Sequence, residues 1–175
     1  MLSPSDDTPP DDIDVILGQW ARERPDLDTE AMGVFGRVYR LARLVGDRQE
    51  QVYGGLGLSR GDFDLLATLR RSGPPFQLSP TDLTRSMMLT SGGTTGRLDR
   101  LERRDLIARS PDPRDRRALV VTLTGTGLAL VDEAVTAGLA AQARVLAALP
   151  GADRTLLSDL LRTLLREATG PEATG

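Results

Sequence analysis

The 175-residue sequence contains no cysteine and no histidine, and all 22 of its cationic side chains are arginines. Without cysteine, the chain can form neither a disulfide nor a thiol redox sensor. Without histidine, it lacks the commonest general base and the commonest metal ligand. A Ser–His–Asp triad and a cysteine nucleophile are therefore excluded. We expect no enzyme activity, no catalytic residue, no metal site and no cofactor.

Long apolar segments and targeting signals are also missing from the sequence. No hydrophobic run is long enough to cross a membrane, and the first residues do not follow the pattern of a signal peptide. We therefore expect a cytoplasmic protein with no membrane partner. The length suits one domain with a real core, or a small domain carrying dimerisation helices.

The most informative part of the chain begins with a helix start signal at Ser79. Ser79 suits the N-cap of a short helix, and Asp82 can complete a capping box with it. The same Ser-x-x-Asp pattern occurs earlier, at Ser59 and Asp62, where it predicts a helix that continues through Arg71.

A second helix is expected over residues 90–105, with Thr90 or Ser91 as its N-cap. Asp105 tolerates the left-handed conformation better than most residues, so the chain can turn there. We expect the outer face of this helix to carry polar and basic side chains: Thr94, Thr95, Arg97, Arg100, Arg103 and Arg104.

Two strands are predicted next, over 107–110 and 118–123; in the second, Leu119, Val121 and Leu123 alternate with Val120 and Thr122. Between them, the sequence PDPRDRR places two prolines and three arginines at an exposed turn. A helix pair followed by a basic hairpin is typical of a winged helix-turn-helix, whose chemistry is DNA binding. The expected fold class is mainly α with a small β-hairpin, flanked by N- and C-terminal dimerisation helices.

The distribution of charge supports a nucleic-acid partner. The whole chain carries a net charge of −3, but nine arginines and six acidic residues give residues 79–117 a charge of about +3. A basic patch on an acidic body favours one orientation toward DNA.

The rest of the chain divides into three further regions. Residues 1–28 are expected to form a disordered tail and an extra helix that begins at Asp11 or Asp12. Residues 29–56 are expected to form a dimerisation helix, leaving 57–123 as the winged-helix region. In 124–175, the final helix carries paired leucines at a density too high for one neighbour, which favours a subunit interface.

These features resemble the MarR family of transcriptional regulators, over about residues 30–168. The matching positions are Ser91, Thr95, Leu98, Leu101, Glu102, Leu106, Ile107, Arg109, Asp112, Arg114, Asp115, Arg116, Arg117, Leu123 and Thr124. Two positions depart from the family pattern: Asp105 replaces a common glycine, and Gly96 lies inside the second helix. The resemblance implies a homodimeric regulator, most simply a repressor, that binds a pseudo-palindromic operator in double-stranded DNA.

The resemblance also implies which residues contact DNA. The helix over 90–105 would enter the major groove, with short polar side chains and two arginines facing DNA: Thr90, Ser91, Thr94, Thr95, Arg100 and Arg103. Arg117 would enter the minor groove, and Asp115 would hold its guanidinium in place. Arg114 and Arg116 would lie near the DNA backbone. The alternative is that these arginines form a solvated, salt-bridged surface.

A narrower resemblance, to a urate-responsive branch of the family, comes from the extra N-terminal helix. Trp20, Asp64, Arg97 and Arg109 match that branch's ligand site in residue type. Such a set suits a planar anion: the aromatic ring can stack on it, the carboxylate can accept its ring N–H donors, and the guanidiniums can pair with its negative charge. Related proteins respond instead to polycarboxylates such as trans-aconitate. The structural alternative is an Asp64–Arg salt bridge with Trp20 as a packing anchor.

A last alternative is a helical protein-interaction module that does not bind DNA. The intact arginine-rich turn argues against this possibility. The glycine cluster at 92–96 lacks the Gly-Lys-Ser/Thr pattern of a nucleotide-binding loop, which argues against an enzyme. We therefore predict a DNA-binding regulator that responds to a small anion.

Overall fold

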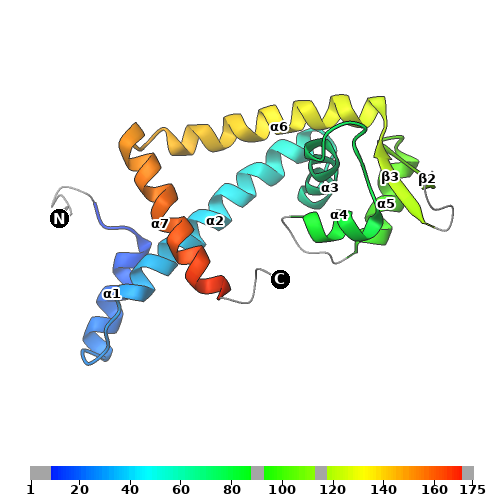
Figure 1. Ribbon diagram of the computed structural model, residues 1–175. Coiled ribbons are helices and arrows are strands. Elements are labelled where there is room, and N and C mark those ends of the chain that lie inside the picture. Colours follow the sequence, from blue (N-terminus) through cyan, green and yellow to red (C-terminus); the bar gives the residue numbers. More distant parts are fainter. Residues whose placement is uncertain (1–8, 88–92, 113–117, 171–175) are drawn as a thin grey trace. The chain divides into compact units, whose positions relative to one another are not determined.

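The computed structural model describes residues 9–87, 93–112 and 118–170 (Figure 1). The chain divides into two compact units, Met1–Asp47 and Arg48–Gly175, which we call the N-terminal unit and the winged-helix unit. Helix α2 (Glu30–Gly55) contributes residues to both.

The N-terminal unit consists of α1 (Asp12–Glu23) and the first part of α2. Asp11 is the N-cap of α1 and forms a capping box with Asp14, which confirms Asp11 as one of the two predicted caps. Ile13 and Leu17 of α1 approach two glycines of α2. A Cβ added to Gly36 would lie 3.2 Å from Ile13, and one added to Gly33 would lie 3.2 Å from Leu17. The extra N-terminal helix is therefore present and packs closely against α2.

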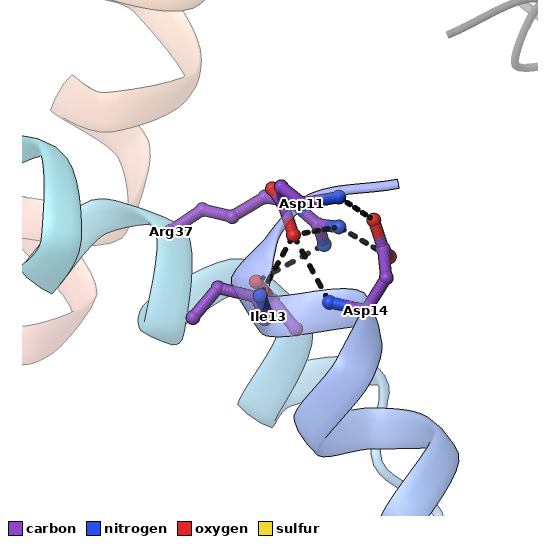
Figure 2. A network of polar contacts seen from close by, with 5 residues as sticks. Asp11, Ile13, Asp14 and Arg37 are labelled. Carbon is purple, nitrogen blue, oxygen red and sulfur yellow. Dashed lines mark hydrogen bonds and ion pairs between the residues drawn. The ribbon is translucent and has the colours of Figure 1, made fainter. Parts of the chain in front are cut away.

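An ionic network reinforces this packing (Figure 2). Arg37 of α2 donates from Nε to Asp11 at 2.9 Å and from Nη2 to Asp14 at 2.5 Å. Arg40 donates to Asp12 at 2.5 Å. The acidic first turn of α1 is thus held by arginines one helical turn apart on α2.

The winged-helix unit contains eight further elements within the described residues. They are α3 (Arg60–Arg71), β1 (Gln77–Leu78), α4 (Pro80–Ser86), α5 (Thr94–Arg103), β2 (Ile107–Pro111), β3 (Leu119–Leu123), α6 (Gly125–Leu146) and α7 (Gly151–Thr169). The strands form an antiparallel sheet in the order β1-β3-β2, with Ile107 opposite Leu123. This is the expected helix-turn-helix and hairpin, with β1 as an unpredicted third strand.

The core of this unit lies where α3, α4 and α5 meet the sheet (Figure 1). Its fully buried side chains are mainly aliphatic: Tyr53, Leu58, Leu65, Leu66, Thr68, Leu69, Leu83, Leu101, Ile107, Val121 and Val131. Leu65, Leu66 and Leu69 lie on one face of α3, and Val121 is the central buried residue of β3. Apolar burial therefore orients the two short helices against the sheet.

Two predictions about the helix starts need correction. The N-cap of α5 is Gly93, with φ of 76°, so the predicted Thr90 or Ser91 cap is wrong. A left-handed backbone suits glycine, which needs no side-chain cap to bend the chain there. In α4, the Ser79 hydroxyl donates to the Asp82 carboxylate at 2.7 Å, where we expected that carboxylate to bind the Ser79 backbone. Asp105 does adopt the predicted left-handed conformation, with φ of 55°.

The C-terminal helix exposes its apolar side chains. None of the described residues of α7 is buried, and Leu165 is 65% exposed in the single chain. Among the described residues, no helix combines the length and the apolar character needed to cross a lipid bilayer.

Candidate nucleic-acid interface and cavity

Helix α5 carries the predicted DNA-contacting side chains that the structure describes. Thr95, Arg100 and Arg103 are exposed, while Thr94 is half-buried and takes part in another interaction. The remaining predicted contacts fall outside the described residues: Thr90, Ser91, Arg114, Asp115, Arg116 and Arg117. The described part of α5 therefore presents short polar and basic groups together.

Arg100 is held by a buried carboxylate from another helix. Its Nη2 donates to Asp62 Oδ1 at 2.6 Å, and the Asp62 side chain is only 4% exposed. Burial opposes the ionisation of Asp62, but hydrogen bonds from Arg100 and Ser59 outweigh it and hold its pKa below the usual range. The charged pair therefore fastens α5 to the first turn of α3.

Arg97 lies inward, which corrects the prediction that it belongs to the outer face of the helix. Its side chain is 18% exposed, and its Nε is 3.9 Å from Asp62 Oδ1. The guanidinium covers Gly61, so closely that a Cβ there would lie 2.6 Å from Cζ. Nε and Nη1 are buried and have no hydrogen-bond partner among the described residues. The absence of a side chain at Gly61 permits this approach.

Arg109, on β2, joins the hairpin of β2 and β3, which we call the wing, to α5. Its Nη2 lies 2.5 Å from Glu102 and 2.7 Å from Asp99, and its backbone N–H donates to Glu102 at 3.1 Å. Hydrogen bonds from Arg109 lower the pKa of Glu102. In turn, hydrogen bonds to Glu102, the larger effect, and to Asp99 raise the pKa of Arg109. Strand β2 is thus clamped to the helix that precedes it.

The other basic residues near the end of α5 bind backbone carbonyl groups. Arg103 donates from Nε to the Asp99 carbonyl at 3.2 Å. Arg104 donates from Nη1 to the Gly57 carbonyl at 2.6 Å, which ties the end of α5 to the loop before α3. The carboxylates of Asp99 and Glu102 bind Arg109 across to β2.

A cavity of about 340 Å³ lies between α2, α3 and α6 within the winged-helix unit. Its lining combines apolar, aromatic and polar side chains: Gln49, Tyr53, Arg60, Phe63, Asp64, Val135, Gly138, Leu139 and Gln142. The rings of Tyr53 and Phe63 are stacked, with centroids 4.0 Å apart. Asp64, which the sequence predicted as a ligand residue, is therefore on a cavity wall and is 7% exposed.

Arg60 supplies the cavity with a cation that sequence reasoning missed. It donates from Nη1 to Gln49 Oε1 at 2.7 Å, and Gln49 in turn donates to the Tyr53 hydroxyl at 3.4 Å. The i, i+4 spacing of Gln49 and Tyr53 places both on one face of α2. The spacing could have predicted that Gln49 and Tyr53 lie together, but no sequence pattern connects that pair with Arg60. The cavity offers a guanidinium, a carboxylate, amides and aromatic rings to a ligand.

The four predicted ligand residues have different surroundings. Asp64 lines the cavity, Arg97 covers the first turn of α3, and Arg109 binds Glu102 and Asp99. Trp20 belongs to α1 of the N-terminal unit and is 40% exposed. Their joint role in binding an anion stays a prediction.

Comparison with known proteins gives a consistent identification. The MarR family model matches residues 58–119. The chain is 36% identical over 150 residues to the HTH-type transcriptional regulator PecS of Dickeya dadantii, covering 86% of this chain and 90% of PecS. It is 31% identical over 103 residues to the HTH-type transcriptional repressor NicR of Pseudomonas putida, covering 59% of this chain and 63% of NicR.

Solved structures show the same fold. BpsR of Bordetella bronchiseptica, whose DNA binding is regulated by 6-hydroxynicotinic acid, superposes with a TM-score of 0.65 at 30% identity. The match covers 79% of this chain and 95% of BpsR. Sco3205 of Streptomyces coelicolor, a MarR family regulator solved in complex with DNA, has a TM-score of 0.72 at 21% identity. That match covers 85% of this chain and 93% of Sco3205.

Proposed function

Because the chain belongs to the MarR family of transcriptional regulators, we propose that it binds a pseudo-palindromic operator as a homodimer and releases it on binding a small planar anion. The observation that carries the DNA-binding part is the exposed polar and basic face of α5. That face lies on a helix fastened to α3 through Asp62 and to the wing through Arg109. A rigid helix with exposed guanidiniums suits insertion into the major groove.

The wing supports the same proposal through its sequence. Arg114, Arg116 and Arg117 lie in the sequence between β2 and β3, and Arg117 is the residue we assign to the minor groove. Phosphate contacts from such a cluster add affinity that falls steeply with salt.

A homodimer is supported by the apolar surface that a single chain leaves in water. On α7 the exposed leucines include Leu156, Leu160, Leu164 and Leu165, and on α2 the exposed apolar side chains include Val34, Phe35 and Tyr39. Surface of this kind on two helices is typical of a subunit interface. Two subunits would present two α5 helices to successive major grooves, about one helical turn apart.

The effector part rests on the cavity beside Asp64. Arg60 would pair with an anionic group, Asp64 would accept a ring N–H or O–H, and the Tyr53 and Phe63 rings would lie beside a planar ligand. Urate is the ligand that the narrower resemblance favours, through Trp20, Asp64, Arg97 and Arg109. BpsR adds 6-hydroxynicotinic acid as a second planar anion to test. A polycarboxylate such as trans-aconitate is the alternative.

Fluorescence anisotropy with a duplex from upstream of the protein's own gene tests DNA binding. If six to ten phosphates are contacted, affinity should fall by about 10³- to 10⁵-fold between about 50 and 200 mM salt. A shuffled duplex of equal length is the control. Absence of binding at low salt would favour the alternative of a helical protein-interaction module.

The effector response is tested on the same complex by titrating urate, 6-hydroxynicotinic acid and trans-aconitate. We expect a planar anion to release the duplex, and Asp64→Asn to reduce that release. The matched control is Asp132→Asn, because Asp132 on α6 binds Arg70 at 2.7 Å and does not line the cavity. Release by trans-aconitate alone would favour the polycarboxylate alternative, and release by none of the three would contradict an effector response.

A further inference from the structure

The first turn of α3 lies between the cavity and the DNA-reading helix. Arg60, its first residue, lines the cavity and holds Gln49 at 2.7 Å. Asp62 comes two residues later, about 200° around the helix axis, and therefore faces away from Arg60. On that side it holds Arg100 of α5 at 2.6 Å. One helical turn thus contacts both sites.

The two carboxylate oxygens of Asp62 bind partners in two different parts of the chain. Oδ2 accepts the Ser59 backbone N–H at 3.2 Å and completes the capping box of α3. Oδ1 accepts the hydrogen bond from Arg100 and also lies 3.9 Å from Arg97 Nε. Since the side chain is only 4% exposed, water is poorly placed to replace either partner. A shift of this turn therefore moves the anchor of α5.

The capping motif does not by itself create this link. In α4 the same Ser-x-x-Asp motif occurs at Ser79 and Asp82, but the Asp82 side chain is 52% exposed and pairs with Arg85 of its own helix. The buried Asp62 is thus a cap residue with a second partner on the DNA-reading helix. Asp82 provides a matched control for any experiment on Asp62.

We propose that Asp62 is a positioning residue that transmits occupancy of the cavity to α5. An anion in the cavity attracts Arg60 away from Gln49 and displaces the first turn of α3. Asp62 carries this displacement to Arg100, and α5 leaves the orientation that fits the operator. The ligand-dependent part rests on the effector response proposed above, whereas the mechanical link between Arg60, Asp62 and Arg100 requires no ligand.

Asp62→Asn removes the charge and keeps the shape and an acceptor oxygen for the cap. In the wild type, we expect the effective one of urate, 6-hydroxynicotinic acid and trans-aconitate to weaken operator affinity by about 5- to 150-fold, the usual range of allosteric coupling. In Asp62→Asn the weakening should fall below about twofold, while the free protein keeps its affinity for the anion. Asp82→Asn should respond like the wild type. Full effector response in Asp62→Asn would overturn the proposal.

Hydrogen exchange tests the mechanical link without a ligand. We expect Asp62→Asn to speed exchange of the α5 amides by about tenfold, with α6 unchanged. Arg60→Ala should also speed α5 exchange in the wild-type background, and should add nothing in the Asp62→Asn background. Equal effects of Arg60→Ala in both backgrounds, or unchanged α5 exchange in Asp62→Asn, would overturn the proposal. Failure of all three anions to release DNA would contradict only the effector response, and the exchange result would still decide the link.

Discussion

Gly61→Ala offers a sharp test of how Arg97 is held. The added Cβ would lie 2.5 Å from Nη2, 2.6 Å from Cζ and 2.8 Å from Nε of Arg97. All three atoms are at the end of a flexible side chain, so the guanidinium can swing into water while the backbone stays in place. We therefore expect the fold to survive and Arg97 to leave the first turn of α3.

The expected change in stability follows from three contributions. Alanine in place of glycine in a helix stabilises by up to about 1 kcal/mol. Release of Arg97 exposes Nε and Nη1, which are buried without a hydrogen-bond partner among the described residues, and each such group costs about 1–3 kcal/mol. Against this stands the lost attraction between Arg97 and Asp62 at 3.9 Å, which is long for an ion pair. We expect the variant to be as stable as the wild type, or more stable by about 1–2 kcal/mol.

Urea unfolding followed by circular dichroism measures this difference. Gly96→Ala is the matched control, because its added Cβ meets nothing within 4 Å and tests the helix-propensity contribution alone. If Arg97 participates in effector binding, Gly61→Ala should also weaken release of the operator. Destabilisation of Gly61→Ala by more than about 1 kcal/mol would refute the reasoning, since it would mean that the clash cannot be relieved by the side chain.

Three further predictions concern pH, the wing and the dimer. Folding lowers the pKa of Asp62, so the stability that its ionised carboxylate contributes is present above its ordinary pKa of 3.8 and is lost as the pH falls through the lower folded pKa. Between about pH 6 and pH 3, the urea midpoint should therefore fall less steeply in Asp62→Asn than in the wild type. Arg117→Ala should weaken operator binding by about 1–3 kcal/mol in anisotropy titrations, and unchanged affinity at near-physiological salt would contradict its assignment to the minor groove. Leu165→Glu should raise the dimer dissociation constant by about thirtyfold or more in sedimentation equilibrium, and a wild-type monomer would contradict the proposed interface.

Features decided by nearby residues were predictable from the sequence. The caps at Asp11 and Ser59 depend on a side chain and a backbone N–H two or three residues away, and both form as expected. The left-handed turn at Asp105 was also predicted, because short carboxylates tolerate that conformation. The alternation over 119–123 predicted the strand β3, but the expected face is only partly correct, because Val120 is buried beside Val121 while Leu119 is exposed.

Predictions from short sequence patterns failed where several residues could each begin a helix, and where a strand is very short. Thr90 and Ser91 are good cap residues, but Gly93 reaches the left-handed conformation without a side-chain cap and begins α5 later. Strand β1 has only two residues, and its pairing with β3 depends on the folded sheet. Periodicity over two residues carries no information.

The sequence by itself determined that this chain forms a winged helix-turn-helix with a basic hairpin, because helix periodicity, capping and turn chemistry operate over a few residues. Only the tertiary structure decided which partners Arg60, Arg100 and Arg109 take. Asp62 binds Arg100 across 38 residues, Arg60 meets Gln49 from another helix, and Arg109 takes the carboxylates of Asp99 and Glu102. A guanidinium can pair with any carboxylate or carbonyl within reach of its long side chain. Its partner is therefore set by which elements pack together, and that packing depends on apolar residues far from the charges.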